Sequence, residues 1–149
     1  MRMLSRVTYD NAFYTHQGWL TEDMTHLMLN DELDEQSSSQ KHTRTLLWDV
    51  VSLTDPKLTG SHYAEVKSID HNLYTLDGKG YLANYCSGLR VLDATKMADG
   101  VAPELAFFDM VDYCDGVIFK GAWSNYPYFK SGTIVVSSIE LGLFLLKMQ

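Results

Sequence analysis

The sequence predicts an all-β protein, built as a β-propeller-type array of three antiparallel blades with four strands in each. The segments 87–93 (SGLRVLD), 141–147 (LGLFLLK) and 45–50 (TLLWDV) repeat one apolar pattern. Their spacing of roughly fifty residues is typical of propellers and related β repeats. Turn signals recur at the same interval, and the segments between them are rich in Val, Leu, Tyr, Phe and Thr. No apolar period near 3.6 residues is sustained, so little helix is expected.

Three kinds of turn set the expected strands. Residues 21–23, 77–80 and 130–132 close the first hairpin of each blade, and glycine turns at 87–88 and 141–142 close a second one. A proline precedes the outer strand of two blades, where a missing backbone donor is tolerated. The expected strands are 12–20, 26–33, 44–51 and 57–64 in the first blade, 69–76, 81–86, 89–95 and 104–111 in the second, and 117–129, 133–139 and 143–148 in the third.

The third blade lacks a fourth strand. Residues 3–9 (MLSRVTY) resemble residues 57–63 (KLTGSHY) of the first outer strand, so we expect this amino-terminal strand to complete the last blade. Propellers usually carry four to eight blades, and an open arc would leave sheet faces and edges bare. Residues 1–149 are therefore expected to form one half-propeller domain, and two copies to join into a six-bladed homodimeric ring.

Composition limits the classes of partner. A hydrophobic content of 46% and a charged content of 21% are those of a folded protein. The formal charge of −7 disfavours nucleic acid and anionic membranes as partners. No run reaches the roughly 18 apolar residues of a membrane span, and no secretion signal precedes the first strand. Cys86 and Cys114 are expected to be buried thiols rather than a disulfide.

Several motifs resemble one known family. Residues 88–94 (GLRVLDA) resemble the LVIVD repeat. Other segments are similar, in the same order, to the carboxyl-terminal half of choice-of-anchor B family proteins; they are 14–23 (YTHQGWLTED), 30–35 (NDELDE), 69–74 (IDHNLY), 121–127 (GAWSNYP) and 141–144 (LGLF). The resemblance implies a secreted or surface-tethered microbial β-propeller without an established common activity. An extracellular or cell-surface location is therefore expected, and the missing leader and sorting tail keep a cytoplasmic location open.

Polar residues recur at matching places in the inner strands. His16 and His71 occupy the same place in the first strands of two blades, where Gly121 stands in the third, and Asp31 and Asn84 coincide in the second strands. Buried polar groups are costly unless they are paired. These residues either form a ligand or ion site on the channel axis or hydrogen-bond neighbouring blades, and both interpretations stay open.

An acidic run at residues 30–35 offers candidate metal ligands. Asp31, Glu32 and Asp34 place oxygen ligands close together, as Ca²⁺ requires. The order of acids does not match an EF-hand loop, and a solvated acidic turn is the alternative. No other cofactor is expected.

A group of aromatic residues offers a candidate sugar platform. Trp19, Trp123 and Tyr126 would supply flat faces for stacking, and Asn125 would supply a polar arm for hydroxyl groups. The alternative is that these rings fill the interfaces between blades.

No catalytic motif is present, and an enzyme is not favoured. The expected function is a non-catalytic recognition or scaffold module that self-associates and binds a glycan or a protein. Two alternatives remain: a polysaccharide-acting hydrolase that uses carboxylates of residues 31–35, and a structural repeat fragment without a ligand.

Overall fold

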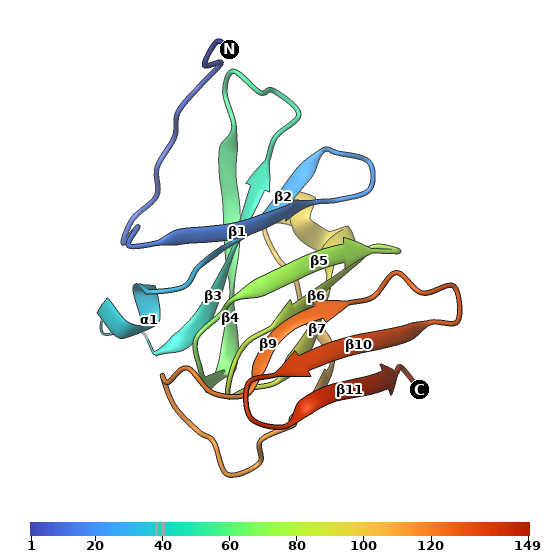
Figure 1. Ribbon diagram of the computed structural model, residues 1–149. Coiled ribbons are helices and arrows are strands. Elements are labelled where there is room, and N and C mark those ends of the chain that lie inside the picture. The colour runs from blue at the N-terminus through green and yellow to red at the C-terminus, as the bar shows by residue number, and fades with distance from the viewer. Residues whose placement is uncertain (38, 40) are drawn as a thin grey trace.

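The computed structural model describes residues 1–37, 39 and 41–149, which form three antiparallel sheets (Figure 1). The first sheet contains β1 (Thr15–Leu20), β2 (His26–Asp31), β3 (His42–Asp49) and β4 (Lys57–Lys67). The second contains β5 (Asn72–Leu76), β6 (Lys79–Ala83), β7 (Leu89–Asp93) and β8 (Glu104–Phe108). The third contains β9 (Ala122–Tyr126), β10 (Thr133–Ser138) and β11 (Gly142–Lys147). The helical turns are α1 (Asp34–Ser37) and the 3₁₀ helix η1 (Ala94–Asp99).

The all-β prediction is confirmed, and each of these strands lies within or overlaps a segment that the sequence predicts. In every sheet the strands follow chain order as an antiparallel meander. The β5–β6 turn shows why local sequence predicts the hairpins. Asp77 and Gly78 at this turn have φ angles of 50° and 67°. Two-residue hairpin turns need positive φ at both positions, which Asp-Gly adopts readily.

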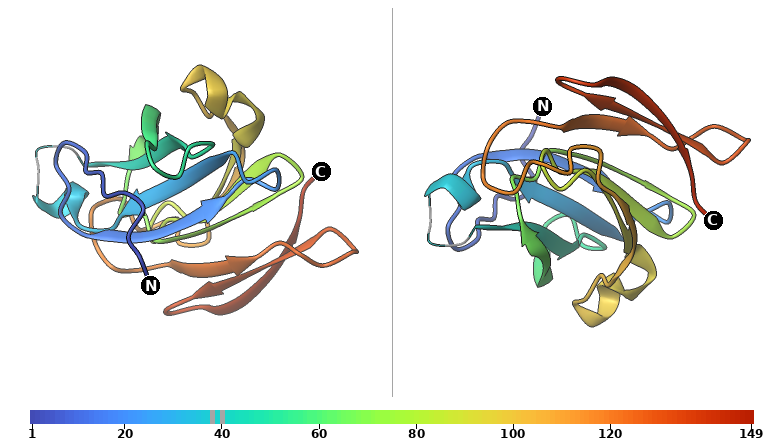
Figure 2. Two further views of the ribbon diagram at one scale, coloured as in Figure 1. Left: turned by 90° about the horizontal axis from the view of Figure 1, so that it is seen from above. Right: turned by 90° about the horizontal axis from the view of Figure 1, so that it is seen from below.

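The second sheet lies between the other two, as Figures 1 and 2 show. The first strands of the three sheets are neighbours, because β1 contacts β5 and β5 contacts β9. Met28 and Leu47 of the first sheet pack on Leu73, Leu82 and Leu92 of the second. A separate apolar cluster joins the second sheet to the third; its members include Tyr81, Ala83, Leu89, Val91, Ala122, Ile134 and Val136. Strands β6 and β7 are therefore covered on both faces.

The prediction that the amino-terminal strand completes the third blade is wrong within the chain. Residues 1–9 form no strand, and the third sheet has three strands, so the array does not close on itself. The reason is that the amino-terminal segment is held beside the first sheet, far from β11 in Figure 1. Ser5 Oγ donates to the Leu53 carbonyl at 2.7 Å, and Tyr9 donates to the Asp31 carboxylate at 2.8 Å.

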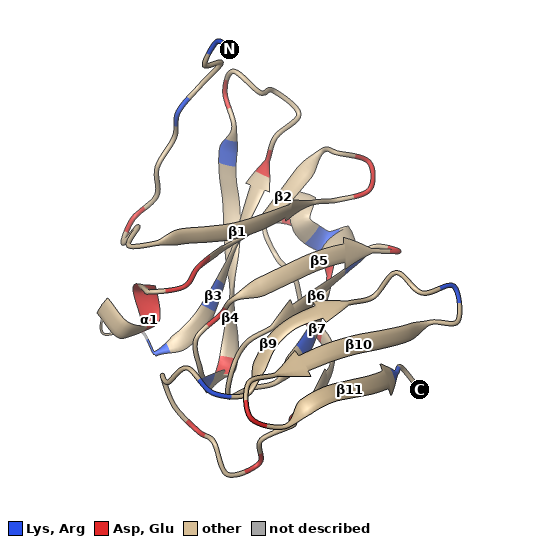
Figure 3. Ribbon diagram, viewed as in Figure 1, with Lys and Arg blue, Asp and Glu red and all other residues tan. Residues whose placement is uncertain are grey.

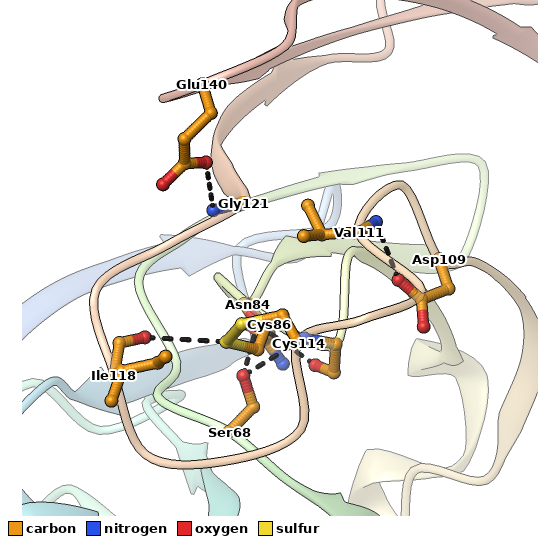
Figure 4. The surroundings of a disulfide bond; sticks show 10 residues. Ser68, Asn84, Cys86, Asp109, Val111, Cys114, Ile118, Gly121 and Glu140 are labelled. Carbon is orange, nitrogen blue, oxygen red and sulfur yellow. Dashed lines mark hydrogen bonds between the residues drawn. A yellow bond between two sulfur atoms is a disulfide. The ribbon is translucent and has the colours of Figure 1, made fainter.

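The expectation of free thiols is also wrong, because Cys86 and Cys114 form a disulfide (Figure 4). Cys114 belongs to the loop between β8 and β9, which turns back onto the second sheet. Val111 of this loop is 1% exposed and packs in the same apolar cluster as both cysteines. The Asp109 carboxylate accepts a hydrogen bond from the Val111 backbone N–H at 2.9 Å, which fixes this turn of the loop. The loop is thus part of the core between the second and third sheets.

In the part of the chain that the structure describes, no helix has the length and apolar character needed to cross a membrane.

Candidate functional site

His16, Glu32 and His71 meet at the amino-terminal ends of β1 and β5. His16 Nε2 lies 3.7 Å from Glu32 Oε2, and His71 Nε2 lies 3.5 Å from Glu32 Oε1. The two imidazole rings stack with centroids 4.5 Å apart. Tyr85 donates its hydroxyl to Glu32 Oε1 at 2.6 Å. These four side chains, from the first and second sheets, are called the histidine–glutamate cluster below.

The second ring nitrogen of each histidine faces a neighbouring backbone. His71 Nδ1 lies 2.5 Å from the Trp123 carbonyl oxygen, and His16 Nδ1 lies 3.4 Å from the His71 carbonyl oxygen. Because a carbonyl oxygen only accepts, Nδ1 carries the hydrogen in both contacts. The same contacts connect β1 to the start of β5, and that segment to β9. The histidines therefore join adjacent sheets and still direct Nε2 toward Glu32.

Burial sets the electrostatics of the cluster. His71 is 3% exposed and Glu32 is 9% exposed. Burial lowers the pKa of His71, against the opposing effects of the Trp123 carbonyl and Glu32. Burial and the hydrogen bond to Glu32 raise the pKa of Tyr85, which therefore remains a hydrogen-bond donor. The cluster combines two imidazole rings, a phenol and a carboxyl group, the usual groups of a small polar or metal-binding site.

Only part of this cluster is visible in the sequence. The repeat pairs His16 with His71, and the structure brings these two together. It also gives a reason for the glycine in the third repeat: Gly121 has a φ of 90°, and a Cβ there would lie 2.5 Å from the Tyr85 carbonyl oxygen. Tyr85 was missed, and Glu32 was considered as a Ca²⁺ ligand or a hydrolase carboxylate but not as a partner of the two histidines. Glu32 follows the last residue of β2 and contacts the two histidines, whereas Asp31 contacts the amino-terminal segment.

A row of aromatic rings crosses the carboxyl-terminal ends of the same inner strands. Trp19 packs edge-on against Tyr74 with centroids 5.0 Å apart, and Tyr74 faces Tyr128 at 6.2 Å. Tyr126 contacts Tyr128 at 5.3 Å and Phe129 at 5.1 Å. We call these five residues the aromatic row. Tyr74 was missed, although it follows Trp19 by about 55 positions, the spacing of the repeat.

A pocket of about 640 Å³ adjoins this row. Its lining includes Trp19, Glu22, Thr75 and Tyr128. Tyr128 is held in place because its hydroxyl donates to the Thr75 carbonyl at 3.0 Å. The pocket therefore combines a fixed aromatic ring with a carboxylate.

Trp123 lies away from the aromatic row. Its ring centroid is 4.5 Å from that of His71, so it flanks the histidine–glutamate cluster. The sequence grouped Trp123 with Trp19 and Tyr126, and the structure separates them along the inner strands. Asn125 is 5% exposed and donates to the Tyr81 carbonyl at 3.0 Å, a packing role between sheets.

Asp31 and Asn84 lie outside both groups. Asp31 is fully buried and accepts hydrogen bonds from the backbone N–H groups of Phe13 and Tyr14 at 2.8 and 2.6 Å. Asn84 is 2% exposed, and its backbone carbonyl accepts a hydrogen bond from Ser68 Oγ at 2.6 Å. Both residues fix connecting segments rather than face a common ligand.

The acidic run from the end of β2 into α1, seen in red in Figure 3, is buried rather than solvated. Asp34 and Glu35 are at most 2% exposed, and Asp70 joins them at 0%. Burial and then Asp34 raise the pKa of Glu35 to about 9, and burial raises the pKa of Asp70 well above its usual range. Arg44 Nη2 lies 2.7 Å from Asp34 Oδ2.

The three candidate Ca²⁺ ligands have separate partners. Asp31 holds the amino-terminal segment, Glu32 belongs to the histidine–glutamate cluster, and Asp34 pairs with Arg44. Among the described residues, the three whose ligand atoms lie within 4.8 Å of one another are instead His16, Glu32 and His71.

Comparison of the chain with protein-family models, curated proteins and solved structures gives no match.

Proposed function

We propose that this chain is half of a six-bladed β-propeller that self-associates and acts as a non-catalytic glycan-binding module of a secreted or cell-surface microbial protein. The observation that carries the binding function is the aromatic row beside the 640 Å³ pocket. Trp19 is 41% exposed, and Tyr126 and Phe129 are each 49% exposed. Exposed rings next to polar groups provide the stacking surfaces and hydrogen-bonding groups that sugars need.

The charge of the site favours a neutral oligosaccharide. Glu22 lines the pocket, and the chain carries a formal charge of −7. An acidic sugar would meet repulsion there, whereas a neutral sugar can donate hydroxyl hydrogen bonds to a carboxylate. The pocket volume lies within the range of small-ligand sites.

A glycan array with binding titrations tests this function. We expect wild-type protein to bind a neutral oligosaccharide, and Trp19→Ala to weaken binding at least about 10-fold because a stacked ring is lost. Tyr113→Ala is the control, since Tyr113 is 68% exposed and lies in the loop between β8 and β9. Release of reducing sugars from a polysaccharide would favour the hydrolase instead. Neither binding nor release would favour a scaffold without a ligand.

The hydrolase alternative is less well supported, because the carboxylates it needs are buried. Asp31, Asp34 and Glu35 are all nearly or fully buried. Asp31 is engaged by backbone N–H groups and Asp34 by Arg44. A glycosidase needs two carboxyl groups that reach the scissile bond, and these residues offer no exposed pair.

Self-association is proposed from the free edge and outer face of the third sheet. Strand β11 pairs with β10, and its other edge carries no described strand. Leu143 and Leu145 are 65% and 68% exposed. Leu145 pairs with Val135 and Leu143 pairs with Ser137, two positions along β10, so Leu143 and Leu145 share one face. An apolar face next to an open edge is the kind of surface that proteins cover by pairing.

The first sheet offers a surface to match it. Its outer face carries Leu27, Leu29 and Trp48, which line a cavity of about 390 Å³ under the amino-terminal segment. In a two-fold ring this face would meet the third sheet of the partner. Residues 3–9 precede β1; in that ring they would leave the contact of Ser5 with Leu53 and lie beside β11 of the partner as its fourth strand. Their likeness to residues 57–63, the start of β4, agrees with that place.

Light scattering after size exclusion tests this assembly. We expect a mass of about 34 kDa, twice the 16.9 kDa of one chain. Leu145→Lys should weaken the dimer by about 100-fold or more, because a charge would be buried in an apolar interface. Tyr113→Lys is the matched control at the same 68% exposure and should remain dimeric. A wild-type monomer would contradict the ring.

An extracellular location is part of the proposal. The Cys86–Cys114 bond is of the kind that persists in oxidising compartments. The resemblance to choice-of-anchor B proteins implies the same location.

A further inference from the structure

The histidine–glutamate cluster contains an excess of electron-pair donors. Nδ1 of His71 holds its hydrogen against the Trp123 carbonyl, so Nε2 of a neutral ring presents a lone pair. His16 is oriented in the same way by the His71 carbonyl. Both lone pairs face the carboxylate of Glu32, which is itself an acceptor. A bound cation, or a proton on one Nε2, would reconcile these three acceptors in a site that is largely buried.

The distances suit a metal ion better than direct hydrogen bonds. The two Nε2–carboxylate separations are 3.7 and 3.5 Å, longer than the usual N–H···O hydrogen bond of about 2.9 Å. Two ligand atoms each about 2.1 Å from one tetrahedral ion lie about 3.4 Å apart. All three ligand atoms are within 4.8 Å of one another, so small side-chain shifts would bring them around one ion.

We propose that His16, Glu32 and His71 bind one divalent transition metal ion of the Zn²⁺ class. The ligands are Nε2 of the two histidines and the carboxylate of Glu32. This inference goes beyond the proposed glycan-binding function, because the aromatic row lies at the other ends of the inner strands. All three ligands come from one chain, so the site does not depend on dimer formation.

The surroundings have the form of a supported metal site. Ligating histidines usually donate their other N–H to a carbonyl or carboxylate, which fixes the ring. Here the carbonyl of Trp123 accepts from His71 Nδ1, and the carbonyl of His71 accepts from His16 Nδ1. Tyr85 donates to the Glu32 carboxylate at 2.6 Å and orients it. These groups are already in position before any ion binds.

The donor set selects the class of metal. Two imidazole nitrogens with one carboxylate suit Zn²⁺ and neighbouring transition metals, whereas Ca²⁺ and Mg²⁺ prefer oxygen ligands throughout. Three protein ligands leave one position of a tetrahedral ion for water or a ligand. The His16 side chain is 23% exposed, while those of Glu32 and His71 are 11% and 4% exposed. The open position would thus be reached from the His16 side.

Titration of chelator-treated protein with Zn²⁺ and Co²⁺ tests the proposal. We expect one Zn²⁺ per chain by calorimetry, and one Co²⁺ that gives the visible absorption of a four-coordinate site with nitrogen and oxygen ligands. Zn²⁺ should also raise the melting temperature, because an ion that binds the folded state stabilises it. Absence of both binding and Co²⁺ absorption in the wild type would overturn the site without reference to any variant.

Variants locate the ion. His16→Ala should weaken Zn²⁺ binding about 100-fold or more and abolish the thermal shift, while the partly exposed position limits damage to the fold. Glu32→Gln should also weaken binding while keeping an acceptor for Tyr85. His26→Ala is the control, since His26 lies on β2 and contacts Thr25 rather than the cluster. Unchanged Zn²⁺ affinity in His16→Ala would place the ion elsewhere and refute the proposal. Loss of glycan binding in Trp19→Ala is a separate outcome and does not affect this one.

Discussion

Replacement of Arg44 by methionine is expected to lower the free energy of unfolding by about 3–5 kcal/mol, because it breaks a buried ion pair on one side only. The Arg44 side chain is 9% exposed, and its Nε and Nη2 each lie 2.7 Å from Asp34 Oδ2. It also donates to the carbonyls of Asp10 and Asn11 at 2.9 and 3.1 Å. Arg44→Met would therefore weaken both the acidic turn and the amino-terminal segment.

The loss should depend on pH. Burial already raises the pKa of Asp34, and Arg44 opposes that rise. Without Arg44 the folded-state pKa of Asp34 climbs further above its unfolded value. A raised carboxyl pKa stabilises the fold below the unfolded pKa, and this stability is lost as pH rises through the folded pKa. The difference between Arg44→Met and wild type should thus be smaller near pH 5 than near pH 8.

Urea denaturation at the two pH values measures this effect. Arg90→Met is the matched control, because Arg90 is also about 8% exposed but pairs with Glu104, whose side chain is 29% exposed. A partly solvated partner loses less when its cation is removed. If Arg44→Met costs no more than Arg90→Met, the buried pair does not stabilise the fold as argued.

Loss of the Cys86–Cys114 bond is expected to lower the free energy of unfolding by about 3 kcal/mol. The two cysteines are 28 positions apart, and a cross-link over a loop of that length restricts the unfolded chain by roughly this amount. Denaturation of wild-type protein with and without reductant measures the effect. The double variant Cys86→Ala, Cys114→Ala should match reduced protein to within about 1 kcal/mol and should not respond to reductant. A wild type that is indifferent to reductant would show that the bond does not form in solution.

The strands were predictable because their signals are local. Alternation and turn chemistry act within about ten residues, and Asp77-Gly78 fixes a hairpin whatever surrounds it. The amino-terminal segment differs, since residues 3–9 have the composition of a strand. Whether they pair depends on which sheet edge they reach. In the structure, the hydrogen bond from Tyr9 to Asp31 holds the segment beside the first sheet. This contact joins residues that are distant in sequence, so a strand pattern does not predict it.

The candidate site was also predictable only in part. The internal repeat places His16 and His71 in register, and the structure brings their rings together. Glu32 was grouped with its sequence neighbours because adjacency suggests a shared site, yet Asp31 contacts the amino-terminal segment and Glu32 contacts the histidines. The contact of Tyr85 with Glu32 and the bond of Cys86 to Cys114 form only when the second sheet packs against its neighbours. Distances of that kind are set by tertiary structure, so one sequence does not reveal them.

The sandwiching of β6 and β7 has a consequence for synthesis on the ribosome. One of their faces is covered by residues that come earlier in the chain, and the other by Ala122, Ile134 and Val136, which come near its end. In a nascent chain that has emerged only as far as β8, one of those faces would be exposed to solvent. The central sheet can therefore reach its native burial only after β9 and β10 have emerged, and folding of the three sheets is expected to be concerted rather than stepwise.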